Sequence, residues 1–153
     1  MSVTGKVILI TGAARGLGLE YANSLGAAGA HIVGGDVLDF SIAGSVSVKL
    51  DVTDMASVEA MVAAALNAYG RIDGLVNNAA LYGSLRGGRF NQIPEQDWDA
   101  AMTVNVKGIW NCCKAVVPAM LSRKQIKMSH FRFSRTAIYS LMSTLSDLFS
   151  AAF

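Results

Sequence analysis

The sequence predicts an α/β fold built on a doubly wound parallel sheet, incomplete at about four to five strands. Short apolar runs alternate along the chain with stretches of helical periodicity, a pattern typical of parallel sheets with helices on both faces. The composition agrees, because 52% hydrophobic and 16% charged residues favour a folded core over a disordered chain. At 153 residues we expect one domain. The apolar runs lie at 6–11, 31–36, 46–51 and 72–77.

The first strand and the first helix are predicted close to the N-terminus. Residues 6–11 are apolar and rich in β-branched side chains, and the run ends at Gly12, which indicates a fully buried strand. Residues 16–28 have helical periodicity, and Gly29 is a suitable residue to end that helix. The second strand, 31–36, then begins.

The middle of the chain predicts another strand and helix. The link that leads to strand 46–51 is too short for a full crossover helix, so one turn of helix or a loop is expected there. Residues 54–69 are strongly helical, with Thr53 or Asp54 as N-cap and Gly70 as C-cap.

A loop and a long helix follow the fourth strand, 72–77. Residues 81–92 contain Gly and Arg and are predicted to form the loop. Pro94 is well suited to the first turn of a helix that runs to about Leu121.

The cysteines and His130 do not indicate a metal site. Cys112 and Cys113 are adjacent, and both a disulfide framework and a zinc site need other spacings. We interpret them as small apolar residues of the long helix, with a reactive thiol as the alternative. His130 has no His or Cys at ligand spacing.

The strongest local signal joins the first strand to the first helix, where residues 11–18 read Thr-Gly-Ala-Ala-Arg-Gly-Leu-Gly. Glycines allow a tight turn and a close approach to pyrophosphate, and the helix N-terminus supplies oriented N–H groups. A glycine-rich turn without a ligand is the alternative, which the strand–turn–helix context disfavours. A P-loop is excluded, because Leu-Glu follows the last glycine. The residues predicted to contact the dinucleotide in this turn are Gly12, Arg15, Gly16, Leu17 and Gly18.

Asp36, at the end of the second strand, predicts which dinucleotide is bound. A carboxylate at this position can accept hydrogen bonds from the adenosine ribose hydroxyls and would repel a 2′-phosphate, which favours NAD over NADP. Arg15 argues weakly for NADP, although no Arg or Lys directly follows Asp36. A simple turn aspartate is the alternative interpretation.

The spacing Thr-Gly-x3-Gly-x-Gly resembles the opening motif of the short-chain dehydrogenase/reductase family, which implies a Rossmann-type sheet. Two further segments fit this resemblance. Asp51-Val52 resembles the family's pair that holds the adenine ring, and residues 77–80, Asn-Asn-Ala-Ala, resemble its Asn-Asn-Ala-Gly motif, with Ala80 in place of Gly. The resemblance therefore adds four residues to the predicted cofactor site, namely Asp51, Val52, Asn77 and Ala79.

Asn105 is the one catalytic residue that the resemblance implies in this chain. It matches the family's helical Asn, which helps a water-mediated proton relay, whereas a helical Asn taken alone is more often solvated or satisfied within a core. The family's chemistry also needs a Ser and a Tyr-x3-Lys pair, with Tyr as general acid/base. No Tyr in this sequence has a Lys four residues later, so we assign the Ser, Tyr and Lys roles to no residue.

The resemblance runs from about Val3 to about Leu121 and matches the N-terminal half of a 3-oxoacyl-reductase-like member. It implies an NAD(P)-dependent oxidoreductase that interconverts a secondary alcohol and a ketone by hydride transfer. The alternative is a catalytically inactive fragment that binds dinucleotide or dimerises. The expected partners are the dinucleotide, a small alcohol or ketone, and a second copy or a full-length relative, but not nucleic acid. The cytoplasm is the expected location, because no apolar run approaches the roughly 18 residues of a membrane span.

Residues 122–153 differ in composition from 1–121, which we interpret as the NAD-binding half. They contain no Gly or Pro and hold five Lys/Arg against one Asp/Glu. A basic segment is predicted there, followed by an amphipathic helix. A novel C-terminus, a helix that docks on the chain's own sheet, and a membrane-surface or partner-binding helix are the three interpretations. We also expect strand 72–77 to be an open edge of the sheet, and the outer face of helix 94–121 to be exposed and apolar.

Overall fold

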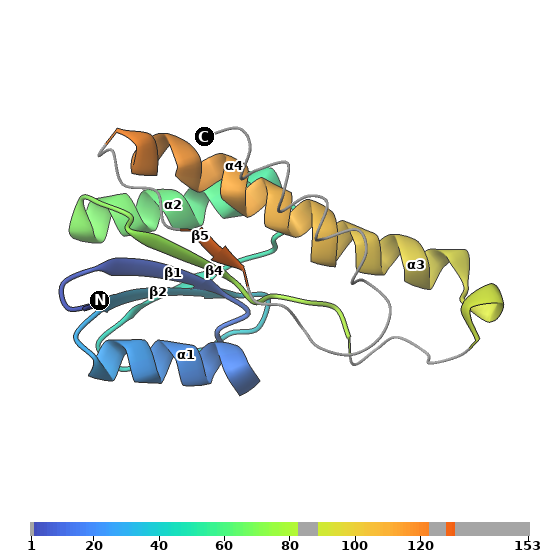
Figure 1. Ribbon diagram of the computed structural model, residues 1–153, viewed down its shortest axis with the longest axis horizontal. Coiled ribbons are helices and arrows are strands. Elements are labelled where there is room, and N and C mark those ends of the chain that lie inside the picture. The colour runs from blue at the N-terminus through green and yellow to red at the C-terminus, as the bar shows by residue number, and fades with distance from the viewer. Residues whose placement is uncertain (1, 83–88, 123–127, 131–153) are drawn as a thin grey trace.

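The computed structural model describes residues 2–82, 89–122 and 128–130, and its centre is a five-stranded parallel sheet with helices on both faces (Figure 1). The strand order is β3-β2-β1-β4-β5, so the chain winds outward from β1 in both directions. This is the doubly wound sheet that the sequence predicts. The strands are β1 (Val7–Thr11), β2 (His31–Asp36), β3 (Val46–Lys49), β4 (Gly74–Asn77) and β5 (Met128–His130).

Helix α1 (Gly16–Ala27) covers one face of the sheet, and α2 (Met55–Tyr69) and α4 (Gly108–Leu121) cover the other (Figure 1). Two apolar clusters match these two layers. Side chains that alternate along β1 contribute to both of them, which explains why this strand is an uninterrupted apolar run. The α1 side is formed by Ile8, Ile10, Ala13, Ala22, Ile32 and Ile42, and the other side includes Val7, Leu9, Val33, Met61, Leu75, Val116 and Met120.

The predicted caps of α2 are present. Asp54 is the N-cap, and its carboxylate accepts a hydrogen bond of 3.1 Å from the backbone N–H of Ala56. Gly70 ends the helix in the left-handed conformation, with φ +68°, and its N–H donates to the carbonyl of Leu66. The link from β2 to β3 has no helix, which matches the loop alternative of the prediction.

The predicted helix 94–121 is not one uniform α-helix. It begins as α3 (Glu95–Met102), passes through a π-helical turn at Thr103–Lys107, and continues as α4. Before it, the predicted loop contains a short 3₁₀ turn, Phe90–Gln92. The π turn contains Asn105, and such turns frequently occur at functional sites.

The expectation of an open edge at β4 is wrong. The short strand β5 lies parallel to β4, with Leu75 opposite Met128 and Asn77 opposite His130. Backbone groups of a buried strand need hydrogen-bond partners, and an extended segment after α4 supplies them. Three residues are too few for periodicity to reveal a strand, which is why the sequence did not predict it.

The amphipathic helix predicted at 138–152 lies outside the described residues, as does most of the basic segment before it. Within 2–82, 89–122 and 128–130, no helix is both long and apolar enough to span a membrane.

Candidate functional site

Most of the predicted site residues lie at one edge of the sheet. Strands β1 to β4 are parallel, so their carboxyl ends meet there. The glycine-rich turn follows β1, Asp36 ends β2, Asp51 and Val52 follow β3, and Asn77 ends β4. Open α/β sheets bind their ligands at this edge.

The glycine-rich turn packs so tightly that two of its positions exclude any side chain. A Cβ at Gly18 would lie 2.0 Å from the carbonyl oxygen of Gly12, and a Cβ at Gly12 would lie 2.9 Å from the Cα of Ala79. Gly12 and Gly16 also have positive φ, +69° and +57°. The turn therefore requires glycine for backbone reasons at all three positions.

The turn also leaves space and hydrogen-bond donors for an anion. A Cβ at Gly16 would meet no heavy atom of the described residues within 4 Å. Arg15 is the N-cap of α1, and among the described residues no side chain caps this helix end and no acidic residue occupies its first turn. Unpaired N–H groups and the positive end of the helix dipole suit a phosphate group, so the residues present fit a dinucleotide.

Hydrogen bonds of Thr11 and Asn78 connect this turn to the segment after β4. The Thr11 hydroxyl oxygen accepts hydrogen bonds from the backbone N–H groups of Asn78 (3.0 Å) and Ala79 (2.9 Å). The Asn78 side-chain amide donates to the carbonyl oxygens of Thr11 and Gly12, at 3.0 Å each. Both residues belong to the sequence motifs, but the motifs alone assigned neither of them a role in the site. The position of Thr11 beside Gly12, and that of Asn78 within the motif at 77–80, were the signals that could have identified them.

Asp36 is only 9% exposed, and its carboxylate joins β2 to the glycine-rich turn. One carboxylate oxygen accepts from the N–H of Ala14 and the other from the N–H of Leu38, both at 3.0 Å. Each carboxylate oxygen can accept more than one hydrogen bond, so acceptor capacity remains for ribose hydroxyls.

Asp51 and Val52 lie in the loop after β3, in contact with α2 and α4. The Asp51 carboxylate accepts from the N–H and the hydroxyl of Thr53, at 2.8 and 2.7 Å. The carbonyl of Val52 accepts from the side-chain amide of Asn111 at 2.9 Å. A Cβ at Gly108 would lie 2.6 Å from the Val52 side chain, so α4 packs directly on this loop. Gly108 and Asn111 were not predicted from sequence, because they have no motif of their own.

Asn77 and the two cysteines lie beneath the site. The Asn77 amide donates to the Cys113 sulfur at 3.5 Å, and its Oδ1 atom is buried with no partner among the described residues. Burial, together with the neighbouring Cys113 thiol, raises the pKa of Cys112 to about 12. Burial also raises the pKa of Cys113, against the opposing effect of the Asn77 hydrogen bond. Both thiols are therefore protonated at neutral pH, which favours the structural role over the reactive thiol.

Asn105 lies in the π turn and binds the backbone that follows β4. Its Oδ1 atom accepts from the N–H of Leu81 at 2.7 Å, and its amide donates to the Leu81 carbonyl at 3.1 Å. The oxygen and the nitrogen of the Asn105 amide therefore both bind the segment after the Asn-Asn-Ala-Ala motif and hold it against the helix.

Comparison with known proteins assigns the chain and its fold to a family. Residues 6–127 match the family described as "short chain dehydrogenase", and the chain belongs to that family. Oxidoreductase UcpA of Salmonella typhimurium is 42% identical over 132 residues, which cover 80% of this chain and 49% of that protein. Galactitol 2-dehydrogenase of Agrobacterium fabrum is 39% identical, and the 3-oxoacyl-[acyl-carrier-protein] reductase FabG of Thermotoga maritima is 36% identical. The match to galactitol 2-dehydrogenase covers 80% of this chain and 50% of that protein, and the match to FabG covers 81% of this chain and 54% of that protein.

Solved structures agree with this assignment. A 3-ketoacyl-(acyl-carrier-protein) reductase from Brucella melitensis, in complex with NADH, superposes with a TM-score of 0.76 at 28% identity, over 84% of this chain and 57% of that one. Levodione reductase gives a TM-score of 0.75 at 27% identity, over 83% and 54%. The expected family and Rossmann-type fold are confirmed. The chain spans about half the length of the curated relatives it matches.

Proposed function

We propose that this chain binds NAD as the dinucleotide-binding half of an oxidoreductase that interconverts secondary alcohols and ketones. One observation carries the proposal. The N-terminus of α1, which no described side chain caps, lies beside the buried carboxylate of Asp36 at the carboxyl edge of the sheet. These are the groups that a pyrophosphate and an adjacent ribose require. The names of the relatives, which are an oxidoreductase, a dehydrogenase and a reductase, support this class of reaction.

The proposed contacts follow the order of the strands. The turn residues Gly12, Arg15, Gly16, Leu17 and Gly18 hold the pyrophosphate. Asp36 accepts the ribose hydroxyls, and Asp51 and Val52 border the adenine ring. Ala79 borders the path from the pyrophosphate toward the reacting ring, and Asn77 contributes to that path through its backbone, because its side chain is buried against Cys113. The exposed side chain of Leu38, directly after Asp36 and Val37, adds apolar surface for the adenine.

NAD is preferred to NADP in this proposal. Asp36 carries the negative charge closest to the ribose, and a 2′-phosphate placed against it would be repelled. The Brucella melitensis reductase, which is similar to this chain, was solved with NADH. Arg15 is the basic residue that opposes this preference, at the N-cap of α1.

The nicotinamide ring, when bound, accepts or delivers the hydride. The residues of this chain bind and orient the cofactor, and Asn105 positions the backbone at Leu81 near the proposed proton relay. The 153 residues hold no Tyr-x3-Lys pair to move the proton at the substrate oxygen. We therefore propose that this chain by itself binds NAD without turnover, which is the second candidate function.

The remaining proposals concern assembly and location. The outer face of α3 and α4 exposes Trp98, Trp110 and Leu121, with Trp98 56% exposed, and this apolar surface supports association with a second copy or a full-length relative. We keep the division between 1–121 and 122–153, the cytoplasmic location, and the small alcohol or ketone substrate as proposals.

A titration of the purified chain with NADH, followed by an assay with ketones, tests both candidates. Binding without turnover supports the binding module. Turnover far above that of an Asp36→Arg sample would contradict the proposed absence of a proton-transfer pair. A folded, monodisperse chain that binds neither NADH nor NADPH would overturn the proposed function.

A further inference from the structure

Asp36 and Lys49 lie on neighbouring strands at the carboxyl edge of the sheet, where the cofactor is proposed to bind. Their side chains are on the same face of the sheet. They are register partners in the parallel pair β2–β3. A Cβ at Gly34, two residues before Asp36, would lie 3.2 Å from Phe40 and 3.3 Å from Ile42. Side chains alternate along a strand, so Asp36 shares the face that carries Phe40 and Ile42, and its register partner Lys49 shares it too.

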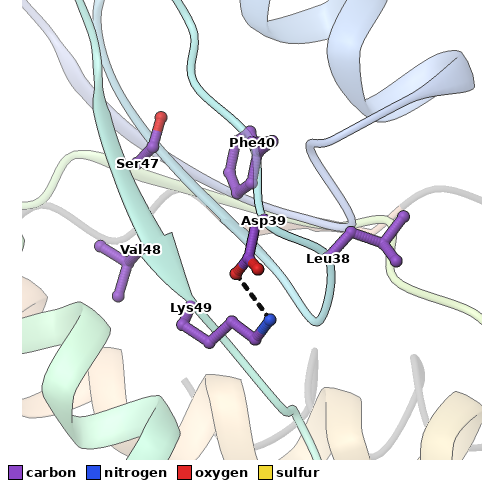
Figure 2. A pocket seen from close by; sticks show the side chains of 6 residues that line it. All are labelled: Leu38, Asp39, Phe40, Ser47, Val48 and Lys49. Carbon is purple, nitrogen blue, oxygen red and sulfur yellow. Dashed lines mark hydrogen bonds and ion pairs between the residues drawn. The ribbon is translucent and has the colours of Figure 1, made fainter.

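The ammonium group of Lys49 forms an ion pair with the carboxylate of Asp39. Lys49 Nζ lies 2.7 Å from Asp39 Oδ1, and Figure 2 shows the two side chains pointing toward each other. The pair borders a pocket of about 220 Å³ that Leu38 also lines. Leu38 links this pocket to the proposed ribose site, because it lines the pocket and its N–H donates to the Asp36 carboxylate.

The ion pair is easy to change without disturbing the fold. The side chains of Lys49 and Asp39 are 63% and 95% exposed, and exposed pairs of this kind are weak. The hydrogen bond from Lys49, and then its charge, hold the pKa of Asp39 below its ordinary value. At neutral pH Asp39 is therefore ionised, and the pair has no net charge.

We propose that Asp39 is a positioning residue that strengthens the preference for NAD over NADP by occupying Lys49. The inference rests on the proposed function, in which the adenosine ribose lies against Asp36. A 2′-phosphate on that ribose would lie beside Asp36, and Lys49 is the cation on the adjacent strand that could offset its charge. While its ammonium binds Asp39, Lys49 adds no net positive charge at that position. Arg15 follows β1, which lies on the other side of β2 from Lys49.

The test uses the full chain in four forms, namely wild type, Asp39→Asn, Lys49→Met and the double variant. Each form is titrated with NADH and NADPH, and circular dichroism checks its fold. In Asp39→Asn, the Kd for NADPH should fall by about threefold to fivefold, the size of one exposed charge interaction, while the Kd for NADH stays unchanged. The gain should disappear in the double variant and shrink at high ionic strength.

Two outcomes would overturn the inference alone. The first is an unchanged ratio of NADPH to NADH affinity in Asp39→Asn while NADH still binds. The second is a double variant that binds NADPH more tightly than Lys49→Met does, by the same factor as Asp39→Asn over wild type. The tighter binding would then come from the lost negative charge of Asp39 and not from the release of Lys49. A wild-type chain that binds no NADH would instead overturn the proposed function, and this inference with it.

Discussion

Gly18, in the first turn of α1, lies so close to Gly12 that a Cβ on Gly18 would be 2.0 Å from the Gly12 carbonyl oxygen. The same Cβ would lie 2.6 Å from the side-chain amide of Asn78, which itself binds that carbonyl. The helix start, the glycine-rich turn and the segment after β4 therefore meet at one point. The proposed pyrophosphate site depends on this contact.

Replacing Gly18 with Ala should abolish NADH binding, because the turn must open to admit the methyl group. Gly26→Ala is the matched control in the same helix, since its Cβ would have only an ordinary contact of 3.8 Å with Ile32. The control should bind NADH normally and gain up to about 1 kcal/mol of stability from the better helix former. Calorimetric titration and thermal unfolding measure both effects. Equal NADH affinity in the two variants would contradict the proposed role of the turn.

Replacing Thr11 with Val should destabilise the fold by about 1–3 kcal/mol, because two backbone N–H groups lose their acceptor while the side-chain shape is kept. Thr53→Val removes a hydroxyl whose partner, within the described part of the chain, is the exposed carboxylate of Asp51, so it should cost far less. Urea unfolding of both variants gives the comparison. Similar losses in the two would show that Thr11 does not anchor the segment after β4.

Asp73 should make the stability of the fold depend on acid pH. Burial raises its pKa, but the hydrogen bonds from Arg71 and the Val7 N–H, with the charges of Arg71 and Lys6, outweigh burial and hold the pKa below its ordinary value of 3.8. A lowered folded-state pKa means that this stabilisation is present above the unfolded-state pKa and is lost as pH falls through the folded-state pKa.

Asp73→Asn should therefore lower the free energy of unfolding by about 1–3 kcal/mol at neutral pH. The difference from wild type should narrow as the pH falls below 3.8. Urea unfolding across the acid range measures it. A difference that stays constant down to the lowest pH would show that charge is not the source of the stabilisation.

Replacing Asn105 with Ala should remove both hydrogen bonds to Leu81 and cost about 1–2 kcal/mol of stability. NADH binding should weaken less than in Gly18→Ala, because Asn105 contacts the backbone after β4 and not the glycine-rich turn. Titration and thermal unfolding of the two variants together make this comparison. A loss of binding as complete as that of Gly18→Ala would place Asn105 in the cofactor site itself.

Sequence predicted the parts of the site that local chemistry determines. The β1–turn–α1 unit follows from an apolar run, spaced glycines and helical periodicity, and Asp36 follows from its place at a strand end. Interactions between segments that are distant in the sequence were not predicted. The bonds from Thr11 to the segment after β4 and from Asn111 to Val52 join residues more than fifty positions apart, and a single sequence has no local signal for them.

Two elements of the fold were missed for related reasons. The π turn at Thr103–Lys107 is five residues long and lies between two α-helices, so helical periodicity alone predicts an uninterrupted α-helix there. Strand β5 is defined by pairing with β4, and its three residues carry no pattern of their own. In both cases tertiary contacts determine the local structure.

The most direct test of the central claim is a calorimetric titration of the monodisperse full chain with NADH, repeated with NADPH. We expect micromolar binding of NADH, weaker binding of NADPH and no binding in Gly18→Ala. A folded chain that binds neither dinucleotide, or that binds NADPH more tightly, would contradict the proposed roles of the glycine-rich turn and Asp36.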